Sequence, residues 1–224
     1  MIILDFGSGN TCQNNPHIVT DMIDGLDILS PEFKKRIVIK WQLFKEAGKN
    51  VPLDRVHFSG ALLYAKGKGY KTTASVFDKE SLLKLLAVTN FDIPFVKIAN
   101  NKDLHYLGDL VPRGIHVIQS VSTTGEVNEC RNHEYLPDWK EALCCVSKYP
   151  ARMEEYEKPF IYDFTSPLRR GISDHTTNWD LYKKYRPKIY ECHYKLEDST
   201  GLDAGDFART PEQLLELDKY IQEN

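Results

Sequence analysis

A short apolar segment followed by a helical segment recurs along almost the whole chain, and this alternation constrains the fold more than any other feature. Short apolar runs predict strands, whereas apolar residues spaced three and four positions apart predict amphipathic helices. Alternating strands and helices fold as parallel strands joined by right-handed crossovers. The predicted strands cover residues 2–6, 36–42, 70–75, 94–99, 115–120, 142–146, 171–174 and 188–193.

The segments between the strands carry helical patterns and end signals. Ile18, Met22 and Leu26 share one face of the first predicted helix. Near the C-terminus, Thr210 and Gln213 form the pattern of a capping box, with a proline at the first helical position. The predicted helices cover residues 16–29, 53–66 and 104–110, with others after Asp78, near Thr177 and after Thr210.

Eight such units predict a (β/α)₈ TIM barrel, and 224 residues lies in the lower part of its size range. Residues 120–140 show no clear helical period, and prolines interrupt residues 151–170. We therefore predict one compact barrel domain over residues 1–224, with some degraded or shortened helical units. The alternative is an open doubly wound sheet, but Gly7 and Gly9 are not followed by the third glycine of a dinucleotide-binding loop.

Composition excludes several classes of protein. The chain is 42% hydrophobic and 27% charged, as in an ordinary globular protein, and its net charge of -3 offers no footprint for nucleic acid. No segment approaches the roughly 20 apolar residues of a membrane span. Five cysteines fit reduced thiols better than a disulfide framework, and the opening MIILDF lacks a signal-peptide pattern. We expect a cytoplasmic protein that binds small molecules rather than nucleic acid or membrane.

Polar residues stand at the carboxyl ends of the predicted strands, where chemistry is found in parallel α/β folds. One face of the fold would thus gather two lysines, several hydroxyls and two histidines. This set suits a ligand with phosphate and carboxylate groups together with a metal. The residues at these ends are Asp5, Lys40, Gln42, Ser75, Lys97, Asn100, Ser120, Ser147, Tyr149, Ser173, Asp174, His175, Glu191 and His193.

His175 and His193 end neighbouring strands, which lie about 4.8 Å apart in a sheet, so both can reach one ion. Such a pair suits Mn²⁺, Fe²⁺, Zn²⁺ or Mg²⁺. Lys40 and Lys97 lie within otherwise apolar strands, where an unpaired ammonium is costly to bury. Facing an anion at the barrel mouth removes that cost. Alternatively, either histidine satisfies a local hydrogen bond, and either lysine reaches water.

These strand-end residues resemble the N-acetylneuraminate (sialic acid) synthase family. The sequence GISDHT at 171–176 is similar to the family's G-x-S-D-H-T, and ECHY at 191–194 is similar to its E-[KR]-H-F. The order of the elements is preserved over nearly the whole chain. Further similar stretches are VIKWQ at 38–42, ASVF at 74–77, VKIA at 96–99, SKYP at 147–150, GLD at 201–203 and TPEQL at 210–214.

The resemblance implies a synthase that condenses phosphoenolpyruvate with an aldehyde sugar similar to N-acetylmannosamine, giving a nonulosonic acid and phosphate. It implies a divalent metal, Mn²⁺ or Mg²⁺ before others, on His175 and His193. Catalytic roles fall to Asp5, Lys40, Lys97 and Asp203. Substrate contacts fall to Gln42, Ser75, Asn100, Ser120, Ser147, Tyr149 and Ser173.

The chain also departs from the family pattern. Asn100 replaces a serine, Lys102 an acidic residue, Asp5 a glutamate and Cys192 a basic residue. The sequence ends after the last predicted helix, so we expect no counterpart of the family's C-terminal antifreeze-like domain, and any homodimer would form through the barrel. Two other hypotheses remain: a Schiff-base aldolase using Lys97, and a non-catalytic barrel that serves as a binding module.

Overall fold

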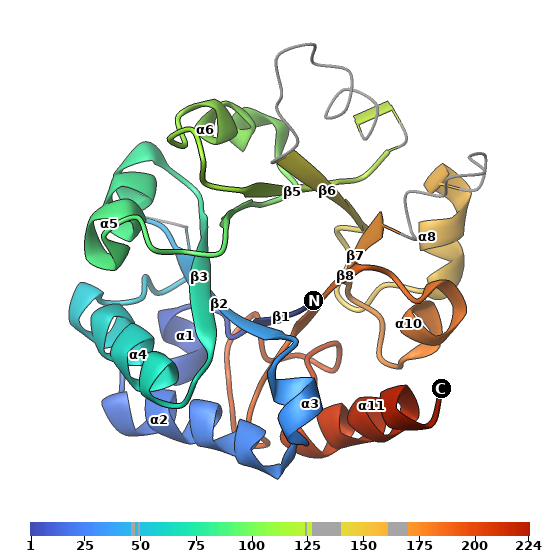
Figure 1. Ribbon diagram of the computed structural model, residues 1–224. Coiled ribbons are helices and arrows are strands. Elements are labelled where there is room, and N and C mark those ends of the chain that lie inside the picture. The colour runs from blue at the N-terminus through green and yellow to red at the C-terminus, as the bar shows by residue number, and fades with distance from the viewer. Residues whose placement is uncertain (46–47, 49, 124, 127–139, 161–169) are drawn as a thin grey trace.

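The computed structural model describes residues 1–45, 48, 50–123, 125–126, 140–160 and 170–224. Eight parallel strands pair in sequence order and close into a barrel, as Figure 1 shows from one end. The pairing of β1 with β8 completes the circle, which confirms the predicted TIM barrel and excludes the open sheet. The strands are β1 (Ile2–Asp5), β2 (Ile37–Leu43), β3 (Lys71–Val76), β4 (Val96–Ile98), β5 (Val117–Val121), β6 (Lys140–Cys145), β7 (Gly171–Asp174) and β8 (Ile189–His193).

Helices surround the barrel and bury their apolar faces against the strands (Figure 1). The predicted caps are present: the Asp78 carboxylate accepts from Ser81 N, and Thr210 and Gln213 form a capping box. The helices are α1 (Gly9–Cys12), α2 (Pro16–Asp24), α3 (Pro31–Lys34), α4 (Arg55–Gly67), α5 (Lys79–Thr89), α6 (Tyr106–Asp109), α8 (Met153–Phe160), α10 (Asp180–Tyr185) and α11 (Pro211–Glu223), with 3₁₀ turns η1 (Gly25–Ile28) and η2 (Lys102–Leu104).

Some helical units are short, as predicted, but two details differ from the prediction. Helix α10 begins at Asp180 rather than near Thr177, because residues 176–179 form a bend held by the Thr176 hydroxyl, which donates to Asn178 O. A helix, α8, also forms where an interruption was predicted: it includes Pro159 and ends one residue later. The rest of the two degraded units, residues 127–139 and 161–169, lies outside the described residues. Within the described chain, no helix combines the length and apolar composition needed to cross a bilayer.

The interior of the barrel is layered, and the layers follow from the two-residue period of a strand. One layer of inward side chains is apolar and forms a floor, composed of Ile3, Val38, Phe95, Ile118, Leu143 and Ile189. At the seventh strand, Gly171 leaves room for Leu143, whose Cδ2 would lie 2.4 Å from an added Cβ. Two residues further along the strands the inward side chains are polar except on β6, where the residue is Cys145. The polar ones include Asp5, Lys40, Lys97, Ser120, Ser173 and Glu191.

Candidate active site

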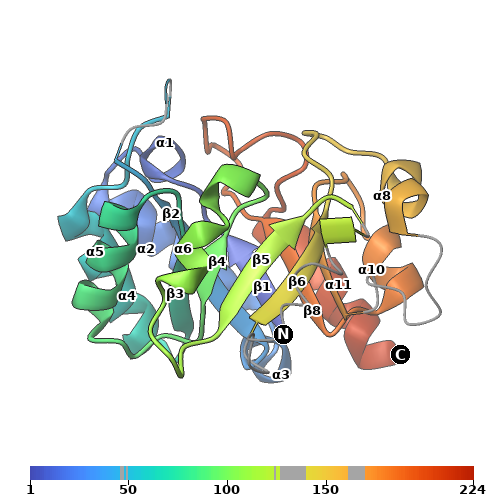
Figure 2. The ribbon, with the colours of Figure 1, turned by 90° about the horizontal axis from the view of Figure 1, so that it is seen from above.

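A cavity of about 540 Å³ opens at the carboxyl ends of the strands, above the apolar floor. Figure 2 shows the loops that follow the strands gathered at this end of the barrel. The structure brings every residue of the predicted site to the wall of this one cavity, although their roles remain predictions. These residues are Asp5, Lys40, Gln42, Ser75, Lys97, Asn100, Ser120, Ser147, Tyr149, Ser173, His175, His193 and Asp203.

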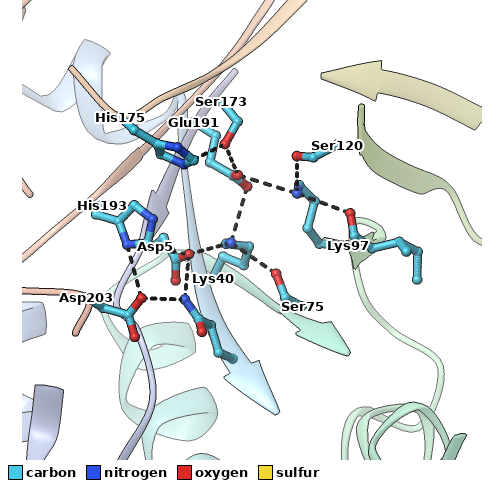
Figure 3. Close-up of polar contacts among 12 residues, drawn as sticks. Asp5, Lys40, Ser75, Lys97, Ser120, Ser173, His175, Glu191, His193 and Asp203 are labelled. Carbon is cyan, nitrogen blue, oxygen red and sulfur yellow. Dashed lines mark hydrogen bonds and ion pairs between the residues drawn. The ribbon is translucent and has the colours of Figure 1, made fainter. Parts of the chain in front are cut away.

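Glu191 lies between the two buried lysines (Figure 3). Its Oε2 is 3.3 Å from Lys40 Nζ, and its Oε1 is 3.4 Å from Lys97 Nζ. The Ser173 hydroxyl donates to Glu191 Oε1 at 2.7 Å. Lys40 also contacts Asp5 Oδ2 at 2.6 Å and donates to the Ser75 hydroxyl. The two ammonium groups are therefore paired by carboxylates that belong to the barrel itself.

Burial and pairing oppose each other in this cluster, and the balance differs between the lysines. Burial lowers the pKa of Lys40, but Asp5 and Glu191 outweigh it, so the pKa rises above its usual value. Burial also lowers the pKa of Lys97, and Glu191 offsets this only in part, so the pKa stays below its usual value. Burial raises the pKa of Glu191, but both lysines outweigh it and bring it to about 2. Glu191 is therefore ionised at neutral pH, and Lys97 is the less firmly protonated lysine.

Lys97 also extends toward a group of hydroxyl and amide side chains. Its Nζ donates to the Ser120 hydroxyl at 2.7 Å, as Figure 3 shows. On the loop after β4, Asn100 Nδ2 donates to the Ser147 hydroxyl at 2.8 Å. Neutral donors beside a buried ammonium group provide the geometry that an anionic oxygen needs. This part of the cavity is suited to a phosphate or carboxylate group.

A second set of polar contacts links Asp5 to Asp203. Gln42 Nε2 lies 3.0 Å from Asp5 Oδ2 and 3.0 Å from Asp203 Oδ1, so the amide bridges the two carboxylates. The positive φ of Gly7, +72°, lets its N–H turn back to Asp5 Oδ1. Burial raises the pKa of Asp5, but Lys40 and His193 outweigh it, so the pKa lies well below its usual value. Burial raises the pKa of Asp203, which makes this carboxylate the more basic of the two.

His175 and His193 lie side by side, with ring centroids 5.4 Å apart. His175 Nδ1 lies 2.6 Å from Val146 O, so it carries the proton and leaves the lone pair on Nε2. Burial, and then His193, bring the pKa of His175 down to about 3, so the ring is neutral. His193 Nδ1 lies 3.5 Å from Asp203 Oδ1 and 3.8 Å from Asp5 Oδ2. His193 Nδ1 therefore faces two carboxylates without a hydrogen bond to either.

These donors fit a divalent cation. His193 Nδ1 and Asp203 Oδ2 are buried without a hydrogen-bond partner. His175 Nε2 lies 3.4 Å from the Ser173 hydroxyl, which already donates its proton to Glu191 Oε1, so the lone pair of Nε2 can still bind an ion. Among the residues that the structure describes, no three His, Cys, Asp or Glu side chains form a complete ligand set. An ion on the two histidines would thus take further ligands from water or substrate oxygens, as open catalytic sites do.

Aromatic rings cover the histidines on the outer side of the cavity. The Tyr149 ring lies 4.2 Å from the His175 ring in a tilted stack, measured between centroids. Phe207 meets the Tyr149 and His193 rings edge-on, each at 5.0 Å. Tyr149 is half exposed, and Leu202, which also lines the cavity, is exposed. This outer wall gives the cavity an apolar side next to the histidine pair.

Several residues of the cavity were not in the predicted site. Glu191 is the most important. It was named among the polar residues at the strand ends, but no role in the site was assigned to it, although residues two apart in a strand face the same side and His193 was expected to point inward. Cys145 lines the cavity on the same principle, and burial raises the pKa of its thiol to about 11. Asn50, Leu202 and Phe207 come from loops, whose paths the sequence pattern does not predict.

Comparisons with known proteins agree with this architecture. The family model described as the NeuB family matches residues 31–223. No curated protein matched the sequence. A solved N-acetylneuraminic acid (sialic acid) synthetase from Leptospira borgpetersenii serovar Hardjo-bovis, in complex with citrate, superimposes with a TM-score of 0.74 at 21% identity, over 99% of this chain and 82% of that one. A solved spore coat polysaccharide biosynthesis protein from Bacillus subtilis superimposes with a TM-score of 0.71 at 19% identity, over 100% of this chain and 67% of that one.

Proposed function

Since this chain belongs to the NeuB family, we propose that it is a synthase that condenses phosphoenolpyruvate with an open-chain aldehyde sugar. The observation that carries the proposal is the meeting, in one cavity, of two buried lysines with the His175–His193 pair. An N-acylated sugar similar to N-acetylmannosamine is the proposed acceptor. The reaction forms one carbon–carbon bond, consumes one water and releases phosphate.

The lysine end of the cavity is the proposed donor subsite. Lys97 would pair with an anionic oxygen of phosphoenolpyruvate, and Lys40 would stay with Asp5 while facing the same group. The side chains that donate to the remaining oxygens would be Ser75, Asn100, Ser120, Ser147 and Ser173. Ammonium and hydroxyl donors fixed in a buried site stabilise the charge of the phosphate as it leaves.

The histidine end is the proposed acceptor subsite. A divalent cation such as Mn²⁺ or Mg²⁺ would supply Lewis-acid polarisation of the aldehyde oxygen when bound to His175 and His193. Tyr149 and Gln42 would hold the open-chain sugar between the outer wall and the carboxylates. The aldehyde carbon would then face C3 of phosphoenolpyruvate.

Water must add to C2 of phosphoenolpyruvate after C3 has attacked the aldehyde, and the phosphate then departs with its bridging oxygen. Asp203 is the proposed acceptor for the proton of that water, because burial raises the pKa of its carboxyl. Asp5, held ionised by Lys40, would orient Gln42 through the hydrogen bond between them. Its negative charge would also stabilise positive charge that develops nearby in the reaction.

Calorimetric titration of phosphoenolpyruvate, with and without Mn²⁺, tests the proposal without a guess about the sugar. Wild-type protein is compared with Lys97→Met, with His175→Ala/His193→Ala and with Lys66→Met, a control on the exposed surface of α4. Loss of donor binding in Lys97→Met and loss of Mn²⁺ binding in the histidine variant would support the synthase. A folded wild-type protein that binds no phosphoenolpyruvate would overturn it.

The lowered pKa of Lys97 favours a second candidate, a Schiff-base aldolase. Such an enzyme would form an imine between Lys97 Nζ and a carbonyl substrate, with loss of water. Borohydride would then trap the substrate on the protein, and the reaction would need no added cation. Trapping that depends on Lys97, without phosphate release, would replace the synthase with this candidate.

A further inference from the structure

We propose that Arg209 is a positioning residue, which fixes the segments that carry His175, His193 and Phe207 in one arrangement. This inference rests on the proposed function in assigning the two histidines to a catalytic cation. Arg209 lies in the loop that joins β8 to α11, outside the cavity, and its side chain extends toward the segment that follows β7. Its exposed fraction is only 1%, so the whole guanidinium is inside the protein.

The guanidinium joins two segments of the chain through their carbonyl groups. Nη2 donates to Asn178 O at 2.7 Å, in the segment that follows His175. Nη1 donates to Phe207 O at 3.1 Å, in the segment that forms the outer wall. The guanidinium carbon also lies 4.7 Å from the centroid of the Trp179 ring. Only a planar side chain with several donors can serve both carbonyl groups at once.

The backbone of Arg209 adds a second connection, directly to the other histidine. Arg209 N donates to His193 O at 2.8 Å, and Lys195 N donates to Arg209 O at 3.0 Å. These bonds form a parallel bridge beside Tyr194, which extends the edge of β8 past its last residue. Residue 209 therefore contacts the strand end that carries His193 through its main chain and the β7 end through its side chain.

Asp174 completes the link on the β7 side. Its Oδ1 accepts from Thr176 N at 2.7 Å, and its Oδ2 accepts from the Tyr190 hydroxyl on β8. Arg209 Nη2 lies 3.9 Å from the same Oδ2, and the exposed fraction of Asp174 is 0%. Asp174 stands between Ser173 and His175 in sequence, so a shift of its carboxylate moves both cavity residues.

Geometry, rather than stability, is what this buried charge is expected to provide. Buried ion pairs add little net stability, because desolvation of two charges offsets their attraction. An apolar side chain could fill the space of Arg209, but it would leave Asn178 O and Phe207 O without this donor. The segments that contain Asn178 and Phe207 would then no longer be held to each other, and the distance between the two histidines would no longer be fixed.

The test compares Arg209→Met, Arg209→Lys and Asp174→Asn/Arg209→Met with wild-type protein. Arg209→Met alone leaves the buried carboxylate of Asp174 without its cationic neighbour, which can prevent folding. The double variant removes both charges, so we expect it to stay folded even if Arg209→Met does not. Asp218→Asn is the matched control: Asp218 is equally buried, on α11, and accepts from Ser30 N and its hydroxyl far from the cavity. Two readouts are measured, Mn²⁺ affinity by calorimetry and the ¹⁵N-labelled imidazole signals of His175 and His193, assigned with their alanine variants.

We expect both arginine-to-methionine variants to bind Mn²⁺ at least tenfold more weakly, in line with losses seen when groups behind metal ligands are removed. Both imidazole signals should shift, while those of Asp218→Asn stay at the wild-type positions. Arg209→Lys should recover only part of the affinity, since one ammonium cannot serve both carbonyl groups. Wild-type signals and affinity in the folded double variant would overturn the proposal and leave Arg209 a structural residue.

The imidazole signals separate this inference from the proposed function. If the wild-type protein binds no Mn²⁺ or yields no phosphate with any aldehyde, the synthase fails. The positioning role would then still stand if both imidazole signals shift in the double variant, and fall if they do not.

Discussion

The carboxylate of Glu191 and the ammonium group of Lys97 face each other inside the barrel, with 3.4 Å between Oε1 and Nζ. Lys40 contacts the other oxygen of the same carboxylate. The cluster is therefore charge-paired before any ligand arrives, and an entering anion competes with Glu191 for Lys97. This competition has consequences for binding, for stability and for pH dependence.

Replacing Glu191 with glutamine should tighten anion binding. The change removes the negative charge next to both lysines while keeping a side chain of the same shape, so an incoming phosphate no longer meets a carboxylate. We expect inorganic phosphate and phosphoenolpyruvate to bind about tenfold more tightly or better, as measured by calorimetry. Glu216→Gln, on the exposed face of α11, is the control and should leave binding unchanged. Weaker binding in Glu191→Gln would show that Glu191 helps to hold the anion.

Acid should weaken the fold through the same carboxylate. The pKa of Glu191 is about 2 in the folded protein, below the ordinary 4.5, because Lys40 and Lys97 outweigh burial. A carboxyl with a lowered pKa stabilises the native state above its unfolded pKa, and this contribution is lost as the pH falls from about 4.5 toward 2. Denaturant titrations in this window, without divalent cation, should show a shallower loss for Glu191→Gln than for wild type. Identical slopes would contradict the pairing.

The apolar floor should carry stability rather than chemistry. Leu143 is fully buried in it and fills the space left by Gly171. Leu143→Ala should lower the free energy of unfolding by about 2–5 kcal/mol, since it removes buried apolar surface and leaves a cavity. Urea unfolding measures the loss. A change below about 1 kcal/mol would mean that the neighbouring side chains collapse into the space.

Tyr156 on α8 should matter more for the histidine site than for the fold. Its hydroxyl donates to Ser173 O at 2.6 Å and accepts from His175 N at 2.9 Å. Tyr156→Phe leaves both buried backbone groups without this partner, at about 1–3 kcal/mol of unfolding free energy. We expect weaker Mn²⁺ binding with phosphoenolpyruvate affinity changed less. Tyr185→Phe, a half-buried tyrosine on α10 that contacts Glu157, is the control. Equal Mn²⁺ affinity in the two variants would refute the link.

Much of the fold follows from the sequence because strand ends and strand periods are local properties. The apolar segments place Lys40 and Lys97 on the inward side, two residues past Val38 and Phe95. The capping box at Thr210 is also a local signal, and it is present as predicted. The gathering of strand-end residues at one cavity needs only the parallel order of the strands.

The remaining features depend on contacts between distant segments. Phe207 and Arg209 lie in the loop after β8, whose path is set by hydrogen bonds to Asn178 and His193 rather than by its own composition. The helix α8 ends one residue after Pro159, so the proline limits the length of the helix without preventing it. Glu191 was named among the strand-end residues, but its pairing with both lysines depends on contacts between β8, β2 and β4 that the sequence pattern does not show.

The pairing of β1 with β8 also determines the order in which the barrel can be built. Ile2 pairs with Tyr190 and Asp5 with His193, so β1 cannot complete its pairing until β8, far later in the sequence, has been synthesised. On the ribosome, β1 can pair early with β2, but its other edge stays open until residues 189–193 have emerged. Contacts of such long sequence separation form slowly, and open strand edges invite pairing with other chains. Newly made chains are thus most prone to aggregate in the interval just before β8 docks.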